Sequence, residues 1–158
     1  MATRALRQRT GGGTARPFRY GEIFRASPAD RIRLIKAGVP AAKVKRLIAD
    51  LNFEQGVLMG ALNLKTATVN RKAARDEALS PEESERVIGV AKLVGQLEAM
   101  VEESGEPEGF DASRWLSQWL REPLPALGGT APMRLLDTME GQALVAQALA
   151  QIQSGAYA

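Results

Sequence analysis

Apolar residues recur every three or four positions along most of the chain, a spacing that places them on one face of an α-helix. The first such segment follows Ser27, which can cap a helix through its side chain, has Pro28 in its first turn, and stops at Gly38. A second segment follows Pro40 and carries Val44, Leu47, Ile48 and Leu51 on one face. These signals predict two short helices between residues 27 and 51.

A longer helix is predicted from Ser80 to about Glu103. Ser80 and Glu83 have the spacing of a capping box, in which each side chain binds the backbone N–H of the other residue. The apolar stripe behind this cap comprises Val87, Val90, Ala91, Val94, Leu97 and Val101. The stripe must be buried, but its periodicity leaves open whether it packs inside one chain or between two copies.

Two further helices are predicted after a polar break over residues 104–109. Asp111 is placed to cap a short helix that carries Trp115 and Trp119, which we expect in the core. Asp137 is placed to cap a last helix, and Gly155 is placed to end it. Because no segment alternates apolar and polar residues, the predicted fold class is all-α.

The charge is distributed unevenly, although the net charge is only +3. Residues 1–36 carry nine Lys or Arg against two Asp or Glu, whereas residues 80–158 carry five against twelve. We interpret the basic front half as facing phosphates and the acidic rear half as facing a protein. Arginines and a run of three glycines, with almost no apolar periodicity, predict a flexible basic arm over residues 1–26.

The composition excludes several kinds of chemistry. The chain has no Cys and no His, which removes disulfides, zinc–thiolate sites and catalytic dyads built on histidine. An enzyme would then need paired carboxylates, but the acidic residues at 82–85 are already explained by a helix N-terminus. No apolar run approaches the roughly 18 residues that cross a bilayer. We therefore expect a cytoplasmic protein that binds rather than catalyses, with no metal and no cofactor.

Residues 58–75 have the spacing of a helix-turn-helix. Leu58 and Leu62 supply the inner face of its first helix, Asn63 stands at a turn that requires positive φ, and Val69 packs the second helix. Because Lys65 occupies the usual cap position, Thr66 is the alternative cap. The second helix offers seven residues suited to bases or phosphates, namely Lys65, Thr66, Thr68, Asn70, Arg71, Lys72 and Arg75. The alternative is an ordinary helical hairpin with a solvated basic face.

Three blocks of sequence are together more specific than this spacing. The first runs from residues 68–72 to residues 79–86, and the third is the tail at 155–158. The second comprises Trp119, Leu120, Pro123, residues 126–129, Pro132, Leu135, Leu136, Thr138 and Gly141. Together they resemble the Xre-type antitoxins that partner RES-domain toxins, which have an MbcA/ParS-like C-terminal domain. The resemblance covers about residues 28–158.

The resemblance implies a protein with two parts. Residues 27–79 would form an Xre-like helix-turn-helix domain that binds the operator DNA of its own operon as an autorepressor. Residues 80–158 would form a helical dimerisation and toxin-binding domain that holds a RES-domain toxin inactive. RES toxins are thought to deplete cellular NAD, so the antitoxin would block access to NAD without binding it. The family also forms dimers, and dimers read two-fold operators, so we expect a homodimer.

The predicted toxin-binding residues are Gly155, Ala156, Tyr157 and Ala158. They combine small residues with one aromatic side chain and a free carboxylate, directly after a helix stop. A slim segment of this kind could enter an enzyme cleft, and a basic cleft built for a pyrophosphate would suit the carboxylate. We therefore expect Tyr157 and Ala158 to plug the active site of the toxin.

Two functions remain open on the sequence. The first is a non-enzymatic antitoxin that inhibits its toxin and represses its own operon. The alternative is a free-standing helix-turn-helix transcriptional regulator whose acidic half only dimerises. A neighbouring reading frame for a RES-domain protein would favour the first function, and an isolated gene would favour the second.

Overall fold

The computed structural model describes residues 18–105, 107–153 and 155. In this part of the chain all regular structure is helical, so the all-α prediction is confirmed. The α-helices are α1 (Tyr20–Arg25), α2 (Pro28–Ala37), α3 (Ala41–Asp50), α4 (Gln55–Ala61), α5 (Thr66–Ala74), α6 (Pro81–Glu103), α7 (Ala112–Arg121) and α8 (Met139–Gln153). Two short 3-10 helices, η1 (Pro125–Leu127) and η2 (Pro132–Leu135), connect α7 to α8. Among these helices, none has both the length and the apolar character needed to span a membrane.

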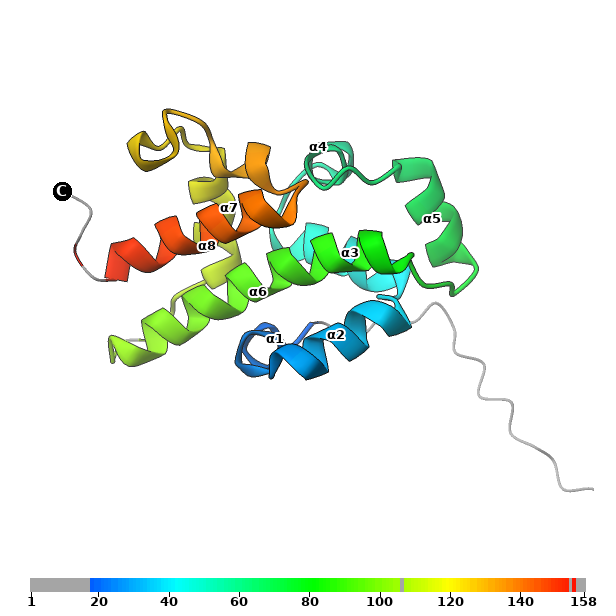
Figure 1. Ribbon diagram of the computed structural model, residues 1–158, viewed down its shortest axis with the longest axis horizontal. Helices are drawn as coiled ribbons and strands as arrows, with labels where there is room; N and C mark the ends of the chain where they lie inside the picture. Colours follow the sequence, from blue (N-terminus) through cyan, green and yellow to red (C-terminus); the bar gives the residue numbers. More distant parts are fainter. Residues whose placement is uncertain (1–17, 106, 154, 156–158) are drawn as a thin grey trace, which may run out of the picture.

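The long helix α6 organises the molecule. It runs along the long axis, with α1 and α2 on one side and α7 and α8 on the other, while α4 and α5 lie towards one end (Figure 1). Val87, Val90, Ala91 and Val94 are fully buried within this single chain. The apolar stripe of α6 is therefore the core of the monomer, which resolves the choice that its periodicity left open.

Local capping signals place the starts of three helices as predicted. Ser27 accepts a hydrogen bond from the N–H of Asp30, and Asp111 accepts one from the N–H of Arg114, each at 3.1 Å. The capping box of α6 is complete: Ser80 Oγ accepts from the N–H of Glu83 at 3.2 Å, and Glu83 Oε1 accepts from the N–H of Ser80 at 3.3 Å.

The cap predicted for α8 is wrong by one residue. Thr138, and not Asp137, stands next to the first helical residue, and its Oγ1 accepts a hydrogen bond from the N–H of Gly141 at 3.0 Å. Thr138 has the three-residue spacing to Gly141 that a capping side chain needs, whereas Asp137 precedes it by one residue. The tryptophans lie as expected: Trp119 is buried, and Trp115 stacks on it with ring centroids 6.1 Å apart.

Residues 18–26 belong to the folded body, so the prediction of a flexible arm as far as residue 26 is wrong for this stretch. Phe18, Tyr20 and Ile23 are all buried in the core. The backbone of α1 contacts α6 directly, because a Cβ at Gly95 would overlap the carbonyl group of Tyr20. The helix α1 has only six residues, which is too short to show an apolar period, and this is why the pattern failed here. Residues 1–17 lie outside the described part of the chain.

Two polar contacts fix α1 in place. The Tyr20 hydroxyl donates to Asp50 Oδ2 at 2.5 Å, and burial, followed by this contact with Asp50, raises the pKa of the phenol above its usual value. The Arg31 guanidinium donates to the carbonyl oxygens of Ile23, Phe24 and Ala26, which terminate α1. A cation at these carbonyl groups satisfies the unpaired acceptors of a helix C-terminus.

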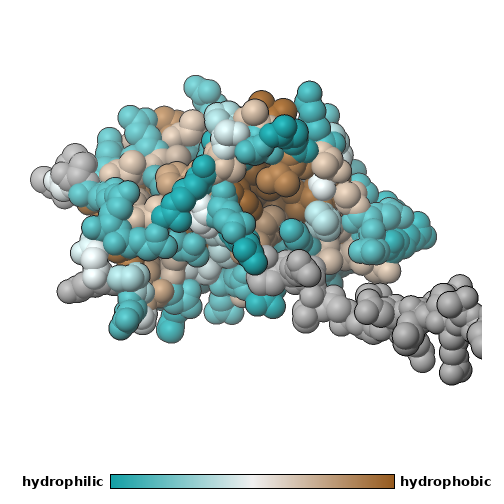
Figure 2. Space-filling view, turned by 90° about the horizontal axis from the view of Figure 1, so that it is seen from below, coloured by the Kyte–Doolittle hydropathy of each residue, from teal (hydrophilic) through white to brown (hydrophobic). Residues whose placement is uncertain are grey.

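An apolar groove of about 480 Å³ opens beside α1, between α2 and α3. Its walls include Ile23, Leu34 and Val39. The helix α2 buries none of its residues, and Ile32 and Leu34 remain 50% and 46% exposed. Figure 2 views the molecule from the side on which α1 and α2 lie and shows a hydrophobic hollow ringed by hydrophilic residues.

Candidate functional site

The predicted helix-turn-helix is formed by α4 and α5, joined by residues 62–65. Asn63 has φ of +52°, the left-handed conformation that the turn requires. Leu58, Leu62 and Val69 are fully buried between the two helices and their neighbours. The spacing therefore predicted both the turn residue and the small core that sets the angle between the helices.

The seven predicted contact residues differ in their exposure to solvent and in the contacts that they already make. Lys65, Arg71 and Arg75 are exposed, whereas Thr66, Thr68, Asn70 and Lys72 are partly covered. Asn70 Oδ1 accepts a hydrogen bond from Gln55 Nε2 at 2.8 Å, and Lys72 Nζ lies 3.7 Å from Glu83 Oε1. Three cationic side chains are thus exposed to solvent along α5, while Asn70 contacts Gln55 of α4 and Lys72 contacts Glu83 of α6.

The cap of α5 differs from the expectation for Thr66. Lys65 occupies the N-cap position, Thr66 is the first residue of the helix, and no side chain caps α5. Thr66 cannot cap because it has already entered the helix. The N–H groups of the first turn of α5 therefore lack a capping side chain, and such groups bind anions such as phosphate.

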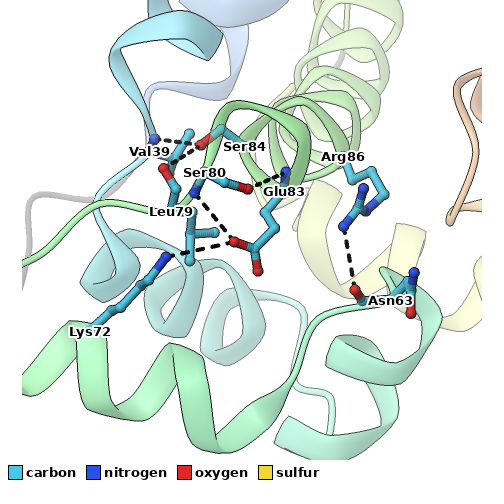
Figure 3. A network of polar contacts seen from close by, with 8 residues as sticks. All are labelled: Val39, Asn63, Lys72, Leu79, Ser80, Glu83, Ser84 and Arg86. Carbon is cyan, nitrogen blue, oxygen red and sulfur yellow. Dashed lines mark hydrogen bonds and ion pairs between the residues drawn. The ribbon is translucent and has the colours of Figure 1, made fainter.

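The first turn of α6 holds α5 in position (Figure 3). Glu83 closes the capping box through one carboxylate oxygen, and the same oxygen faces the ammonium group of Lys72. Both side chains of this ion pair are only 20% exposed, so the pair is less screened than a surface pair. The sequence indicated the cap, but not that the capping residue also contacts α5.

Two residues of α6 that the sequence analysis missed tie it to the rest of the front half. Arg86 donates from Nε to the carbonyl oxygen of Leu62 at 2.7 Å and from Nη2 to that of Asn63 at 3.3 Å, at the end of α4 (Figure 3). Ser84 is fully buried and accepts a hydrogen bond from the N–H of Val39 at 2.8 Å. These partners lie 23 to 45 residues apart, so no local pattern could have revealed them.

Arg86→Met is expected to loosen the turn of the helix-turn-helix. The variant keeps an apolar stem but leaves the carbonyl groups of Leu62 and Asn63 without their charged donor. A hydrogen bond to a charged group contributes about 1.5–3 kcal/mol, so the free energy of unfolding in urea should fall by about that amount. Amide hydrogen exchange should become faster at Asn63 and Leu64. Arg114→Met, at an exposed position on α7, is the matched control, and equal effects of the two variants would contradict this role of Arg86.

The rear of the molecule offers a different kind of surface. In α8 the only charged residue is Glu140, although a quarter of the whole chain is charged. Met139 and Leu144 of this helix are 37% and 48% exposed. Gly155, at the predicted helix stop, is exposed with φ of +68°. The predicted contact residues Ala156, Tyr157 and Ala158 lie outside the described residues.

In the part of the chain that the structure describes, no group of three or more metal-ligating side chains converges on one point. The carboxylates that attract attention in the sequence are used at helix termini: Glu83 closes a cap and Asp111 provides one. Among the described residues, the helix-turn-helix therefore presents a basic helix, α5, and the C-terminal half presents a nearly uncharged helix, α8.

Two family models match successive parts of the chain. Residues 30–92 match the model of the antitoxin Xre-like helix-turn-helix domain, and residues 96–155 match that of the antitoxin Xre/MbcA/ParS C-terminal toxin-binding domain. The two matches meet inside α6.

Three similar proteins are antitoxins by name. A Sphingobium protein named Prs ADP-ribosylating antitoxin is 66% identical over 152 residues, which cover 96% of this chain and 95% of that protein. An antitoxin Xre of Pseudomonas putida is 33% identical over 88 residues, covering 56% of this chain and 50% of its own length. An antitoxin Xre of Yersinia enterocolitica is 24% identical over 123 residues, or 78% of each chain.

Proposed function

The chain belongs to the Xre family of antitoxins, and from this premise we propose that it inhibits a RES-domain toxin that consumes NAD and that it represses its own operon. One observation carries the proposal: a helix-turn-helix with exposed cations and a toxin-binding domain share the single helix α6. A free-standing regulator whose second half only dimerises would not need a toxin-binding domain there.

For the toxin, the proposed mechanism is occlusion. The tail formed by Gly155, Ala156, Tyr157 and Ala158 enters the cleft that binds NAD, and the antitoxin itself binds neither NAD nor a metal. The name of the Sphingobium relative supplies a second candidate for the toxin's chemistry, ADP-ribosylation of Prs. Hydrolysis of NAD and transfer of its ADP-ribose group both break the bond between ribose and nicotinamide, so a plug in the NAD cleft stops either reaction.

For DNA, the proposed mechanism is binding of an operator by α5. Lys65, Arg71 and Arg75 are exposed and are suited to phosphates and to the guanine edge. The proposed contact set also includes Thr66, Thr68, Asn70 and Lys72. Of these, Asn70 is hydrogen-bonded to Gln55, and Lys72 forms an ion pair with Glu83.

We also propose a homodimer, because a helix-turn-helix reads a two-fold operator as a pair. The apolar groove between α1, α2 and α3 is the surface that we assign to the second copy (Figure 2). Its rim carries both signs of charge, with Arg19 and Lys43 beside Glu22. A surface with both signs can face a copy of itself across a two-fold axis. Dimerisation through residues 80–158, expected from the sequence, stays a second prediction beside this assignment.

Co-expression with the protein of the neighbouring reading frame tests the proposal. We expect the chain alone to have about twice its mass of 17.0 kDa by light scattering, and to co-purify with its neighbour. The complex should consume NAD much more slowly than the free toxin and should bind promoter DNA, but not unrelated DNA, at the same salt concentration. If the chain binds promoter DNA and forms no complex, the free-standing regulator is the correct function.

A further inference from the structure

We propose that Gln55 determines part of the operator specificity, because it holds the amide group of Asn70 so that α5 presents this asparagine to a base as a hydrogen-bond donor. The base that fits such a donor has acceptor atoms on its major-groove edge, as guanine has, and cytosine is disfavoured. Gln55 is thus a positioning residue that acts through Asn70. The inference rests on the proposed function, because it takes α5 as the helix that binds operator DNA.

Asn70 lies beside the outer face of α5. Val69, which is fully buried, marks the inner face of this helix. Ala67, Arg71 and Ala74 are exposed, and their spacing of four and three residues places them together on the opposite face. Asn70 follows Val69 by one residue, or about 100° around the helix, so it stands at the edge of the outer face and is partly covered. A side chain in this place reaches a base edge when the outer face of α5 enters the major groove.

A hydrogen bond from the preceding helix fixes the direction of the Asn70 amide. Gln55, the first residue of α4, donates from Nε2 to Asn70 Oδ1 at 2.8 Å. Among the described residues, the Asn70 side chain makes no other hydrogen bond. An asparagine amide has an oxygen that accepts and a nitrogen that donates two hydrogens. Because the oxygen is directed to Gln55, the NH₂ group is the end of the amide that is left for a ligand of α5.

The two donors of this NH₂ group discriminate between bases. Guanine presents two acceptors in the major groove, N7 and O6, whereas cytosine presents only a donor, its N4 amino group. Two donors that face each other leave both without a partner, and an unpaired polar group in an interface is unfavourable. The hydrogen bond from Gln55 opposes the half-turn of the amide that would exchange its oxygen and nitrogen. It also orders the Asn70 side chain before DNA binds, which lowers the entropy lost on binding.

Gln55→Glu tests the direction of the amide. A carboxylate only accepts hydrogen bonds, so the new side chain pairs with the NH₂ group of Asn70 and turns the amide oxygen outward. We expect the ratio of the affinities for guanine and for cytosine, at the base that Asn70 contacts, to fall by at least about tenfold. Gln55→Leu removes the hydrogen bond without reversing it, and should lower the same ratio by a smaller factor, about threefold.

The measurement is competition between promoter fragments that differ at one base pair at a time, at one salt concentration. The base that Asn70 contacts is the one at which Asn70→Ala loses the discrimination. In the Asn70→Ala background, Gln55→Glu should not change the ratio further, because Gln55 acts through Asn70. Val57→Glu is the matched control, since Val57 is an exposed residue of the same helix. It adds a negative charge whose repulsion by phosphates is independent of sequence, so it should weaken binding to all fragments alike.

The outcomes separate this inference from the proposed function. If Gln55→Glu keeps the wild-type ratio, if Asn70→Ala changes the ratio at no base, or if the wild-type chain prefers cytosine at the Asn70 base, the inference is wrong and operator binding stands. If the wild-type chain does not prefer promoter DNA to unrelated DNA, the proposed operator function is wrong and the inference falls with it. Circular dichroism and an unchanged midpoint of unfolding in urea show that each variant is folded, so a changed ratio then reflects the base contact.

Discussion

Removal of residues 155–158 is expected to abolish inhibition of the toxin while leaving most of its binding intact. The tail is the segment proposed to fill the NAD cleft, whereas the rest of the toxin-binding domain, matched over residues 96–155, would hold the toxin. A truncated chain that ends near Gln153 keeps all of α8, the last helix of that domain. The loss should therefore appear in the rate of NAD consumption and not in the amount of complex.

The measurement compares NAD consumption by the toxin with a saturating excess of full-length or truncated antitoxin. We expect full toxin activity in the presence of the truncated chain, and an affinity for the toxin reduced by less than about tenfold, because all helices of the toxin-binding domain remain. Tyr157→Phe, which keeps the ring, is the control and should inhibit normally. Complete inhibition by the truncated chain would remove the plug model, and loss of binding together with inhibition would show that the tail supplies the affinity.

Arg71→Ala combined with Arg75→Ala is expected to lower operator affinity by about a hundredfold or more, since each arginine that contacts a base or phosphate contributes about 1–3 kcal/mol. Both side chains are exposed on α5, so their removal leaves the core intact. The dependence of log K on log salt should also become shallower, because fewer phosphates are neutralised.

Lys72→Ala is the informative comparison for this pair. Lys72 faces Glu83 and is 20% exposed, so we expect its removal to change the affinity and the salt dependence less than the double variant does. Titration of promoter DNA at several salt concentrations distinguishes the two variants. A double variant that binds the promoter as tightly as the wild-type chain would show that α5 is not the reading helix. Inhibition of the toxin should remain normal in both variants, because α5 lies outside the toxin-binding domain.

Two features of the site were predictable from sequence because they depend on residues a few positions apart. The turn residue Asn63 and the inward residues Leu58, Leu62 and Val69 are set by the spacing of two short helices. A similar local rule fixed Ser80 and Glu83 as a capping box. Two cap predictions failed, and each by a single residue: Thr138 and not Asp137 caps α8, and Thr66 is the first residue of α5 and not its cap.

The sequence by itself therefore determined the helical class, the position of the helix-turn-helix and most helix starts, because these depend on side chains close together in the chain. It also determined the opposite charges of the two halves, which follow from composition alone. Only the tertiary structure decided that residues 18–26 pack on α6, that the stripe of α6 is buried within one chain, and that Lys72 and Arg86 join α6 to the helix-turn-helix. The physical reason is that these contacts join residues 11 to about 75 positions apart. Residue types and spacing do not encode which of many possible distant partners a buried or charged group meets, and packing of the whole chain selects it.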